Sequence, residues 1–492
     1  MLAASQRYPE KIAPQRGGQK IYVANKCFEL LAHGERGGGK TTVNIIDYCR
    51  DVGKWGHFWR GILFRRTYPE LSDVIQKSHQ IIPKLHPGAK WVGGSTPSWT
   101  FPGGEALLFR QIKRDDEYWK YHGHEYPWIC FEELTTWNTP VLYKRMMTCC
   151  RSSGPKEMPR KMRSSTNPSG PGHNWVKLWF QLPGLPGKIL SEKITRTFDF
   201  TDEVRTCQAV KMDFEANLAL IEADPGYQAN ILMGARNAGE LAAWKDGDWD
   251  IVSGGMFDDV WDKNKHIVPD FEVPSTWRID RAFDWGSSKP FSVGWWAESD
   301  GSDVKIGNRW FSTIKGDLFR IAEWYGWTGE PNEGLRMLAV DITKGIVERE
   351  MAMGLHGRVK AGVADSAIFT VENGESIAID MGKPVLVNGK MEKGVQWLRA
   401  DKSAGSRITG WEMVRKRMMA SAAKAPREYP GLFVCAHCDQ FLRTIPTLQR
   451  DLEKNPDDVN TDTEDHIADE VRYRVRFSTQ RPTGGRVKGT PS

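Results

Sequence analysis

The chain has 492 residues, of which 40% are hydrophobic and 26% are charged, and its formal net charge is +6. One hydrophobic core does not serve this length, so we expect two or three domains of ordinary globular composition. No apolar run approaches membrane-spanning length, and the first residues lack an apolar signal core, so we expect a soluble protein that is neither membrane-spanning nor exported. The small positive charge permits a polyanionic partner without requiring one.

Residues 34–41 read GERGGGKT, the G-x-x-x-x-G-K-[ST] pattern of a phosphate-binding loop. The apolar residues before it suit a buried strand, and residues 41–50 suit a helix whose positive N-terminus would face the anion. Glycines let backbone N–H groups line a phosphate, Lys40 would reach the β- and γ-phosphates, and Thr41 would place its hydroxyl on Mg²⁺. The alternative is a glycine-rich hinge. The pattern predicts an ATP and Mg²⁺ site with these residues: Gly34, Glu35, Arg36, Gly37, Gly38, Gly39, Lys40, Thr41 and Thr42.

Residues 126–134, YPWICFEEL, form an apolar run that ends in two glutamates. A buried parallel strand carries active carboxylates at its C-terminal end, beside the phosphate loop. Glu132 would hold Mg²⁺ through water, and Glu133 would polarise the attacking water as a general base. The alternative is an acidic helix start after a strand.

Residues 161–166 are expected to form a further strand, followed by a turn at Asn167 and Pro168. Thr166 and Asn167 are polar side chains at a strand end, where they could sense the γ-phosphate. Without further context, however, the stretch is simply a turn.

The C-terminal half carries three separated acidic positions. Residues 277–298 predict a hairpin whose first strand ends at Asp284, and residues 357–368 include a short strand that ends at Asp365. Residues 462–477 predict a helix with Ile467, Val471 and Val475 toward the core. Asp465 and Asp469 are four residues apart, so both can lie on one face near the start of that helix.

Carboxylates from these positions could gather around Mg²⁺ or Mn²⁺, which prefer oxygen ligands. Two such ions about 3.5–4 Å apart would clamp the attacking water and the leaving oxygen of a phosphodiester. The alternative is that isolated aspartates at strand ends form turns.

The chain has eight scattered cysteines, which predict a reducing compartment rather than a disulfide framework. The only CxxC is CAHC, from Cys435 to Cys438, and no second pair stands nearby to complete a zinc site. We therefore expect buried thiols there.

GERGGGKT, WICFEEL and SSTNPSGPGH, in this order and spacing, resemble the large subunit of the terminase of tailed bacteriophages. The resemblance spans about residues 21–477. It implies an α/β fold with an N-terminal P-loop ATPase on a mainly parallel sheet and a C-terminal RNase H-like nuclease. It also implies that Thr166 and Asn167 couple ATP hydrolysis to motion.

Two arginine assignments follow from the same resemblance. Arg36 looks like the phosphate-sensing arginine of the family. LYKRMMTCCRSSG resembles the segment that lends an arginine to a neighbouring subunit; Arg151 matches best, but Cys149 stands where relatives often carry arginine, so the choice between Arg145 and Arg151 stays open. Such an arginine would neutralise charge that builds up on the γ-phosphate.

The resemblance also extends to the acidic motifs of the nuclease, which it places at AFDWG, VADSA and EDHIADEVRY. It implies that Asp284, Asp365 and Asp465 are catalytic metal ligands, with Asp469 as the next choice for the third position and His466 as another. Basic residues between the second and third motifs could contact DNA phosphates, although a solvated surface is the alternative; they are Arg399, Lys402 and Arg407.

We expect an ATPase domain at residues 1–268, with a small closing subdomain near 205–268, a nuclease domain at 269–478 and a basic flexible tail at 479–492.

The implied partners are double-stranded DNA, a small terminase subunit, the portal ring of a prohead and further copies of this chain. The copies would form a ring motor within the host cytoplasm, with a monomer in solution as an alternative state. The competing interpretations are a helicase-like ATPase whose C-terminal half binds DNA without cutting, and an assembly protein with a degenerate ATP site.

Overall fold

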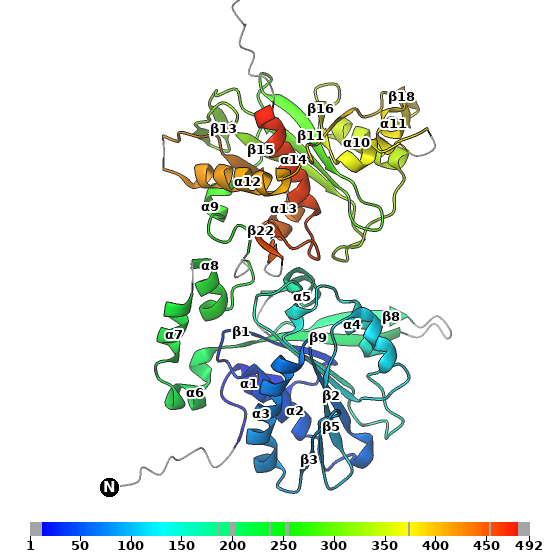
Figure 1. Cartoon of the computed structure of the whole chain (residues 1–492), viewed down its shortest axis with the longest axis vertical. Coiled ribbons are helices and arrows are strands. Elements are labelled where there is room, and N and C mark those ends of the chain that lie inside the picture. Colours follow the sequence, from blue (N-terminus) through cyan, green and yellow to red (C-terminus); the bar gives the residue numbers. More distant parts are fainter. Residues whose placement is uncertain are drawn as a thin grey trace, which may run out of the picture. The chain divides into compact units, whose positions relative to one another are not determined.

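The computed structural model describes residues 12–184, 187–195, 202–235, 238–250, 255–371, 374–424, 426–451 and 454–480. The chain forms two compact units, Met1–Gly254 and Gly255–Ser492 (Figure 1). Within the described residues, no helix combines the length and the apolar character that crossing a bilayer requires.

The first unit is built on a nine-stranded sheet in the order β3-β4-β5-β2-β6-β7-β1-β9-β8. The strands from β5 to β9 in this order pair in parallel, and antiparallel pairs occur at both ends. The strand bounds are β1 Glu29–Gly34, β2 Arg60–Arg65, β3 Lys90–Val92, β4 Ser98–Thr100, β5 Ala106–Gln111, β6 Trp128–Glu132, β7 Lys161–Ser165, β8 Leu190–Thr195 and β9 Asp202–Met212.

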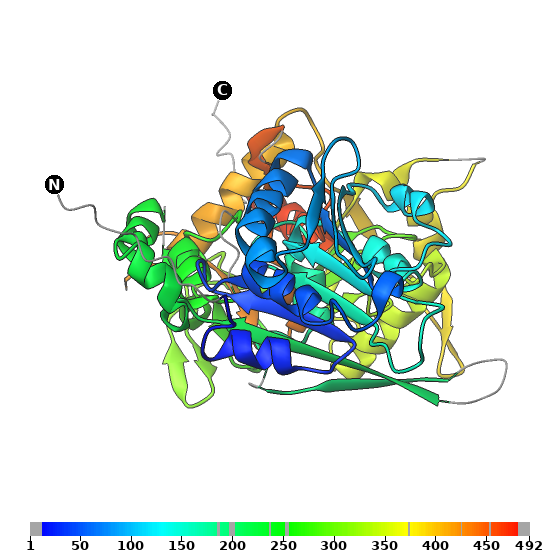
Figure 2. The ribbon, with the colours of Figure 1, turned by 90° about the horizontal axis from the view of Figure 1, so that it is seen from below.

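Helices cover both faces of this sheet because successive side chains of its buried strands point to opposite sides. Leu30 and Ala32 of β1 pack in the hydrophobic cluster of α2 and α3, whereas Leu31 packs in the cluster of α4 and α5. Helices α2 and α3 lie beside the strands in both views (Figures 1 and 2). The helix bounds are α1 Gly18–Ala24, α2 Lys40–Cys49, α3 Tyr68–Leu85, α4 Val141–Met147, α5 His173–Trp179, α6 Leu218–Ala223, α7 Tyr227–Gly234 and α8 Ala238–Leu241.

The second unit has a seven-stranded mixed sheet in the order β10-β20-β15-β12-β11-β16-β19. The strands β11, β12 and β15 form an antiparallel meander, and β16, β19, β20 and β10 join in parallel pairs. The strand bounds are β10 Ile267–Val268, β11 Arg278–Asp284, β12 Ser292–Glu298, β15 Leu318–Tyr325, β16 Lys360–Ala364, β19 Trp397–Arg399 and β20 Leu432–Cys435. The hairpins β13 Val304–Ile306 with β14 Arg309–Phe311, β17 Val385–Val387 with β18 Lys390–Glu392, and β21 Arg450–Asp451 with β22 Asn455–Val459 lie outside this sheet.

Two hydrophobic clusters line the faces of the second sheet, one with α12 and α14 and the other with α10 and α11. The helix bounds are α9 Lys263–His266, α10 Ala339–Ala352, α11 Ile377–Gly382, α12 Ser406–Ala422, α13 Asp439–Thr444 and α14 His466–Gln480. Ile467, Val471 and Val475 of α14 are buried in the first of these clusters, as their four-residue spacing predicts. The expected fold class is confirmed: an α/β chain with a mainly parallel sheet that carries the phosphate loop, followed by a second α/β unit.

The boundary between the units differs from the sequence expectation. Residues 255–268, assigned above to the ATPase domain, belong to the second unit, where Met256 and Phe257 enter the core and β10 pairs with β20. Pro269 directly follows β10 inside this unit and ends that strand, and Pro274 lies in the connection to β11. Residues 205–268, where a small closing subdomain is expected, hold most of β9, then α6, α7, α8 and a π-helix at Ala242–Asp246, and, in the second unit, α9 and β10.

The expected tail lies mostly outside the described residues. Helix α14 continues to Gln480, two positions into that stretch, and residues 481–492 are not described.

Candidate active sites

The phosphate loop joins the end of β1 to the start of α2. Its glycines are required sterically: Gly37 has φ +79°, and a Cβ added at Gly38 would lie 2.6 Å from the carbonyl oxygen of Met212. Asn217 donates a hydrogen bond to the carbonyl of Gly37 at 2.6 Å. The segment after β9 therefore packs directly on the loop and determines its shape.

Lys40 is 8% exposed, and its ammonium group points back over the loop. Its Nζ donates to the carbonyl of Glu35 at 2.6 Å and to Oδ1 of Asn167 at 2.7 Å. Burial lowers the pKa of Lys40 to about 8, against the opposing charges of Glu133 and Glu132. Both hydrogen-bond acceptors are uncharged, so the charge of Lys40 is available to an anion bound in the loop.

Glu132, the last residue of β6, is held by three donors. The Thr41 hydroxyl donates to its Oε2 at 3.1 Å, the Ser165 hydroxyl to the same oxygen at 2.7 Å, and Asn44 Nδ2 to its Oε1 at 2.9 Å. The structure thus brings Glu132 and Thr41 together, as expected for a shared Mg²⁺ site. Asn44 and Ser165 were not anticipated; the signal for Asn44 is its position three residues after Thr41 on the same helix face.

Glu133 has a left-handed backbone, with φ 55° and ψ 60°, which is unusual for a residue with a side chain. The N–H and the side-chain Nδ2 of Asn167 donate to its carboxylate at 3.3 and 3.4 Å, and the Thr166 hydroxyl lies 3.5 Å away. Burial raises the pKa of Glu133, opposed by Lys40 and Arg65. Asn167 therefore bridges Lys40 and Glu133, one through its amide oxygen and the other through its nitrogens.

A buried charge cluster lies beneath this site. Asp47 of α2 accepts from Nε of Arg163 at 3.0 Å and from Nζ of Lys161 at 3.2 Å, and both donors are on β7. The charges of Arg163 and Lys161 outweigh burial and hold the pKa of Asp47 below its usual value. The cluster fixes α2 on β7 and so fixes the loop relative to Thr166, which follows β7.

The three arginines proposed for catalysis lie at separate places. The Arg36 guanidinium stacks 3.8 Å from the ring centre of Trp244 in the π-helix. The backbone N–H of Arg36 donates to the carbonyl of Trp244 at 3.0 Å. Arg145 and Arg151 are exposed and donate to the carbonyls of Asp115 and Gly123 at 3.2 and 2.8 Å. Trp244 was not anticipated, because only the tertiary packing brings it to the loop.

In the second unit, the first two acidic positions are adjacent. Asp284 ends β11, and Asp365 follows β16, which pairs in parallel with β11 at Phe283 and Ala364. The N–H of Asp365 donates to the carbonyl of Phe283 at 2.9 Å. The carboxyl ends of neighbouring parallel strands thus meet at one edge of the sheet.

The start of α14 brings the third acidic motif to the same edge. His466 Nδ1 lies 3.4 Å from Oδ2 of Asp284. Burial raises the pKa of Asp284 to about 7, with Asp469 and Asp365 adding to the rise and His466 opposing it. Burial and then Asp469 raise the pKa of Asp465 to about 6. The carboxylates that were expected to converge therefore lie close enough to destabilise one another's charged forms.

Basic side chains are paired with these acids. Lys402 Nζ lies 2.5 Å from Oδ1 of Asp365. Arg407 contacts Asp465 at 3.3 Å and Asp469 at 3.0 Å, and its Nε lies 2.7 Å from Asp458. Within the described ranges, no group of three or more His, Cys, Asp or Glu side chains is arranged to hold a metal ion. The expected ligands are thus gathered but engaged with cations.

Tyr473 is a member of this site that sequence reasoning missed. It is 2% exposed, and its pKa is raised by burial and by the charges of Asp284, Asp469 and Asp365. Its position four residues after Asp469 on α14 places it on the face of the acids, which is the signal that could have identified it.

The remaining sequence expectations concern surface bases and cysteines. Arg399 is exposed and donates to the carbonyl of Phe369 at 3.4 Å. Cys435 and Cys438 are buried thiols, as expected, with burial as the main cause of their raised pKa values. All eight cysteines lie in the described part of the chain and are free.

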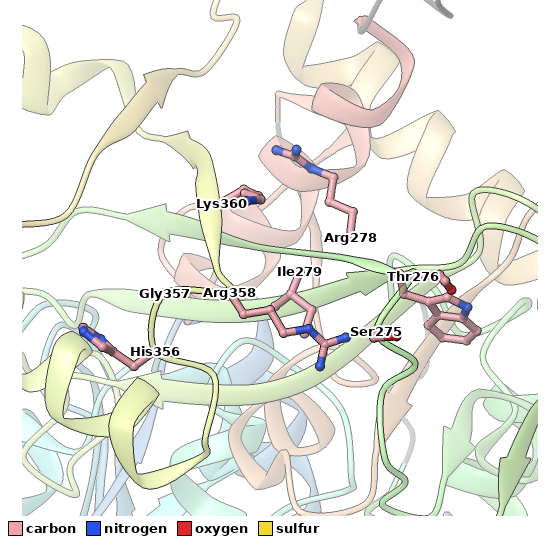
Figure 3. A pocket seen from close by; sticks show the side chains of 9 residues that line it. Ser275, Thr276, Arg278, Ile279, His356, Gly357, Arg358 and Lys360 are labelled. Carbon is pink, nitrogen blue, oxygen red and sulfur yellow. The ribbon is translucent and has the colours of Figure 1, made fainter.

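A pocket of about 640 Å³ lies elsewhere in the second unit (Figure 3). Arg278 and Lys360, at the starts of β11 and β16, line it, so it lies at the opposite end of these strands from Asp284 and Asp365. Arg278 is paired with Asp280 at 2.8 Å, and Arg358 donates to the carbonyl of Val273 at 3.1 Å. The pocket therefore lies apart from the acidic site.

No family model and no curated protein matches the chain. Its structure is similar to solved phage large terminases. The large terminase of a thermophilic bacteriophage, in complex with ADP, is 15% identical, with 95% of this chain and 100% of that chain covered and a TM-score of 0.37. The large terminase of bacteriophage HK97 is 10% identical, with 94% of this chain and 95% of that chain covered and a TM-score of 0.42. The P22 large terminase nuclease domain is 16% identical, with 46% of this chain and 93% of that chain covered and a TM-score of 0.30. Similarity at these values does not establish an activity.

Proposed function

We propose that this chain is a DNA-packaging motor in which the first unit hydrolyses ATP to drive double-stranded DNA into a prohead and the second unit cuts the DNA. The motif resemblance supports the biological role. The observation that carries the chemistry is the link Lys40–Asn167–Glu133, which joins the phosphate loop to a carboxylate through one amide.

In this proposal, Lys40 exchanges its two uncharged acceptors for phosphate oxygens of ATP, because an anion attracts the ammonium group more strongly than a carbonyl does. The loop N–H groups from Gly37 to Thr42 would hold the remaining phosphate oxygens, since the N–H groups of Glu35 and Arg36 are bound to the carbonyls of Met212 and Trp244. Mg²⁺, when bound, neutralises charge on the phosphates, and Thr41 with Glu132 would hold it.

Glu133 acts as the general base. Burial raises its pKa, which brings it toward the operating pH and makes it a better proton acceptor than an exposed glutamate. Its left-handed backbone directs the carboxylate toward Asn167, and strain of this kind is concentrated at functional positions.

Asn167 reports the state of the nucleotide. When Lys40 leaves its Oδ1 for a phosphate, the amide can reorient, and when phosphate departs, Lys40 returns. Thr166 and Asn167 directly follow β7, so this exchange is connected to the sheet. This is a physical account of the coupling role that the resemblance implies for Thr166 and Asn167.

The second unit is proposed as a metal-dependent endonuclease. Asp284, Asp365 and Asp465, with Asp469, supply oxygen donors of the kind that Mg²⁺ and Mn²⁺ prefer. Burial is the main cause of the raised pKa values of Asp284 and Asp465, and the neighbouring carboxylates add to them, so a bound cation would stabilise the charged forms of both groups. Bound metal would activate a water for attack on phosphorus.

The proposed motor acts as a ring of copies in which Arg36 senses phosphate and Arg151, or else Arg145, reaches a neighbour's nucleotide. DNA, a small terminase subunit and the portal ring are its other proposed partners. The proposed place of action is the host cytoplasm, and the proposed ATPase domain includes the small subdomain of α6 to α8.

The test uses the full chain and two variants. Lys40→Ala is expected to abolish ATP hydrolysis and leave Mn²⁺-dependent nicking of plasmid DNA intact, whereas Asp365→Asn is expected to do the reverse. The matched control is Asp341→Asn, an exposed aspartate on α10. A folded chain that hydrolyses ATP but never nicks DNA would favour the helicase-like alternative, which the Lys402–Asp365 ion pair also suits.

A further inference from the structure

The stretch from the end of β19 into the first turn of α12 carries both cations that contact the acidic site. Lys402 is in the connecting loop, and Arg407 is in the first turn of α12. Residues 402–405 are exposed, and Gly405 has φ +77° with open space around its Cβ position. The two cations therefore enter the acidic site from the solvent side.

These cations contact the same oxygens that a divalent ion would need. The Lys402 ammonium lies 2.5 Å from Oδ1 of Asp365, and Arg407 contacts both Asp465 and Asp469. Asp284 is paired with His466 instead. A carboxylate lone pair that accepts a short hydrogen bond is not free to coordinate a metal, so the ion pairs and the metals compete.

The ion pairs are accessible enough to exchange. The Lys402 side chain is 41% exposed and that of Arg407 is 29% exposed, in contrast to fully buried pairs such as Arg320 with Glu470. An isolated, partly exposed pair such as Lys402 with Asp365 is weak because water competes with both partners, whereas Arg407 is held more firmly because it contacts Asp458, Asp465 and Asp469. DNA phosphates present a second set of anions to the same two cations.

We infer that Lys402 and Arg407 are exchangeable internal counter-ions: they neutralise the acidic site in the DNA-free chain and transfer to DNA phosphates when DNA binds. Their departure frees Asp365, Asp465 and Asp469 for divalent metal ions. DNA binding and metal binding therefore promote one another, and metal loading is restricted to chains that hold DNA. This inference rests on the proposed nuclease function.

The first measurement is Mn²⁺ affinity of the full chain without DNA, by isothermal titration calorimetry. Lys402→Gln is expected to bind Mn²⁺ more tightly than the unaltered chain, by roughly fivefold, the scale of a partly exposed ion pair. Lys402→Arg retains the charge and should stay within about twofold of the unaltered chain, the limit set by small surface effects. Lys416→Gln, which removes an exposed lysine paired with Glu412 on the same helix, is the matched control and should change nothing.

The second measurement is affinity for a short DNA duplex in EDTA, by fluorescence anisotropy. Lys402→Gln and Arg407→Gln should each weaken DNA binding and reduce its dependence on salt by about one phosphate contact. Circular dichroism and thermal melting verify that each variant is folded. Arg407→Lys provides a second, charge-conserving variant if Arg407→Gln does not fold.

The outcomes separate the two proposals. If Lys402→Gln leaves Mn²⁺ affinity unchanged or lowers it while the unaltered chain binds Mn²⁺ and nicks DNA, the counter-ion inference is overturned and the nuclease proposal stands. If the unaltered chain neither binds Mn²⁺ with DNA present nor nicks DNA, the nuclease proposal fails and the counter-ion inference fails with it. Tighter Mn²⁺ binding together with weaker DNA binding supports the inference.

Discussion

The two candidate sites differ in what their charged groups contact. In the first unit, the Lys40 ammonium donates to a carbonyl and an amide oxygen, and Glu133 accepts from the amide and backbone of Asn167. In the second unit, Asp365, Asp465 and Asp469 are paired with the cations Lys402 and Arg407. Uncharged partners fix the position of a charged side chain and leave its charge, whereas partners of opposite charge neutralise it.

This difference bears on how each site would be switched on. The phosphate loop retains its charge and its shape, so a nucleotide can bind without first breaking an ion pair. The acidic site must lose cations before it can gain metal ions. On the proposed functions, ATP could bind whether or not DNA is present, whereas metal ions would bind once DNA has taken up the two cations.

The largest predicted effect concerns the phosphate-loop site of the first unit, where Lys40 and Glu133 have uncharged partners. Glu133→Gln keeps the shape of the carboxylate but removes the base, so ATP should still bind while hydrolysis falls on the order of 10²–10⁴-fold. Steady-state phosphate release and binding of a fluorescent ATP analogue measure the two properties. Glu222→Gln, an exposed glutamate on α6, is the control. Hydrolysis that survives Glu133→Gln would remove Glu133 from the mechanism.

The next prediction concerns the buried ion pair of Glu470 and Arg320, which holds α14 and so supports the acidic site of the second unit. Glu470 of α14 is fully buried against Arg320 and accepts from Trp296 at 2.7 Å. Glu470→Gln leaves Arg320 with Glu323, at 3.3 Å, as its remaining charge partner, and should destabilise the second unit by about 3 kcal/mol, the lower end of the usual cost of breaking a buried pair. Hydrogen exchange should rise in α14 and β12 but not in α2 and β7. Equal protection in variant and parent would contradict this.

A third prediction tests whether the phosphate-loop site of the first unit needs an arginine from a neighbouring chain. If Arg151 serves a neighbour, mixing Arg151→Ala with Glu133→Gln chains should restore part of the ATPase activity, because some interfaces combine two intact contributions. Each variant alone should be nearly inactive. The same mixture with Arg145→Ala decides between the two arginines. Absence of rescue with both, in chains shown by light scattering to associate, would argue for a role within one chain.

The smallest effect concerns pH and the cluster beneath the loop. Arg163 and Lys161 hold the pKa of Asp47 below its unfolded value, so Asp47 contributes stability that is full above about pH 4 and is lost as pH falls through the folded pKa. A pKa difference of one between the folded and unfolded states corresponds to about 1.4 kcal/mol. After correction for the intrinsic exchange rate, which itself falls with pH, the protection of α2 against hydrogen exchange should therefore decrease as the pH is lowered from about 4 to about 3. In Asp47→Asn this acid-dependent loss of protection should be smaller, and an unchanged loss would exclude Asp47 as its source.

Local patterns were enough to predict several features. The glycine spacing and the apolar flanks of GERGGGKT located the strand, the loop and the helix, because the backbone around a phosphate loop is dictated by residues adjacent in sequence. The spacing of Ile467, Val471 and Val475 predicted the buried face of α14. Asp284 and Asp365 were predicted at strand ends, whereas the parallel pairing of β11 with β16, which brings these ends together, is a contact that only the structure shows.

Other features depend on contacts between residues far apart in the sequence. The boundary after Gly254 follows from the pairing of β10 with β20, which no local pattern of prolines reveals. The stacking of Arg36 on Trp244 and the bridge of Asn167 between Lys40 and Glu133 each join segments brought together only by folding. The sequence by itself identified the motif residues of each candidate site, because their types and spacing are local, but it did not identify Asn44, Ser165, Trp244 or Tyr473. Only the tertiary structure decided which charges are cancelled, because the partner of a charge is set by distance in space.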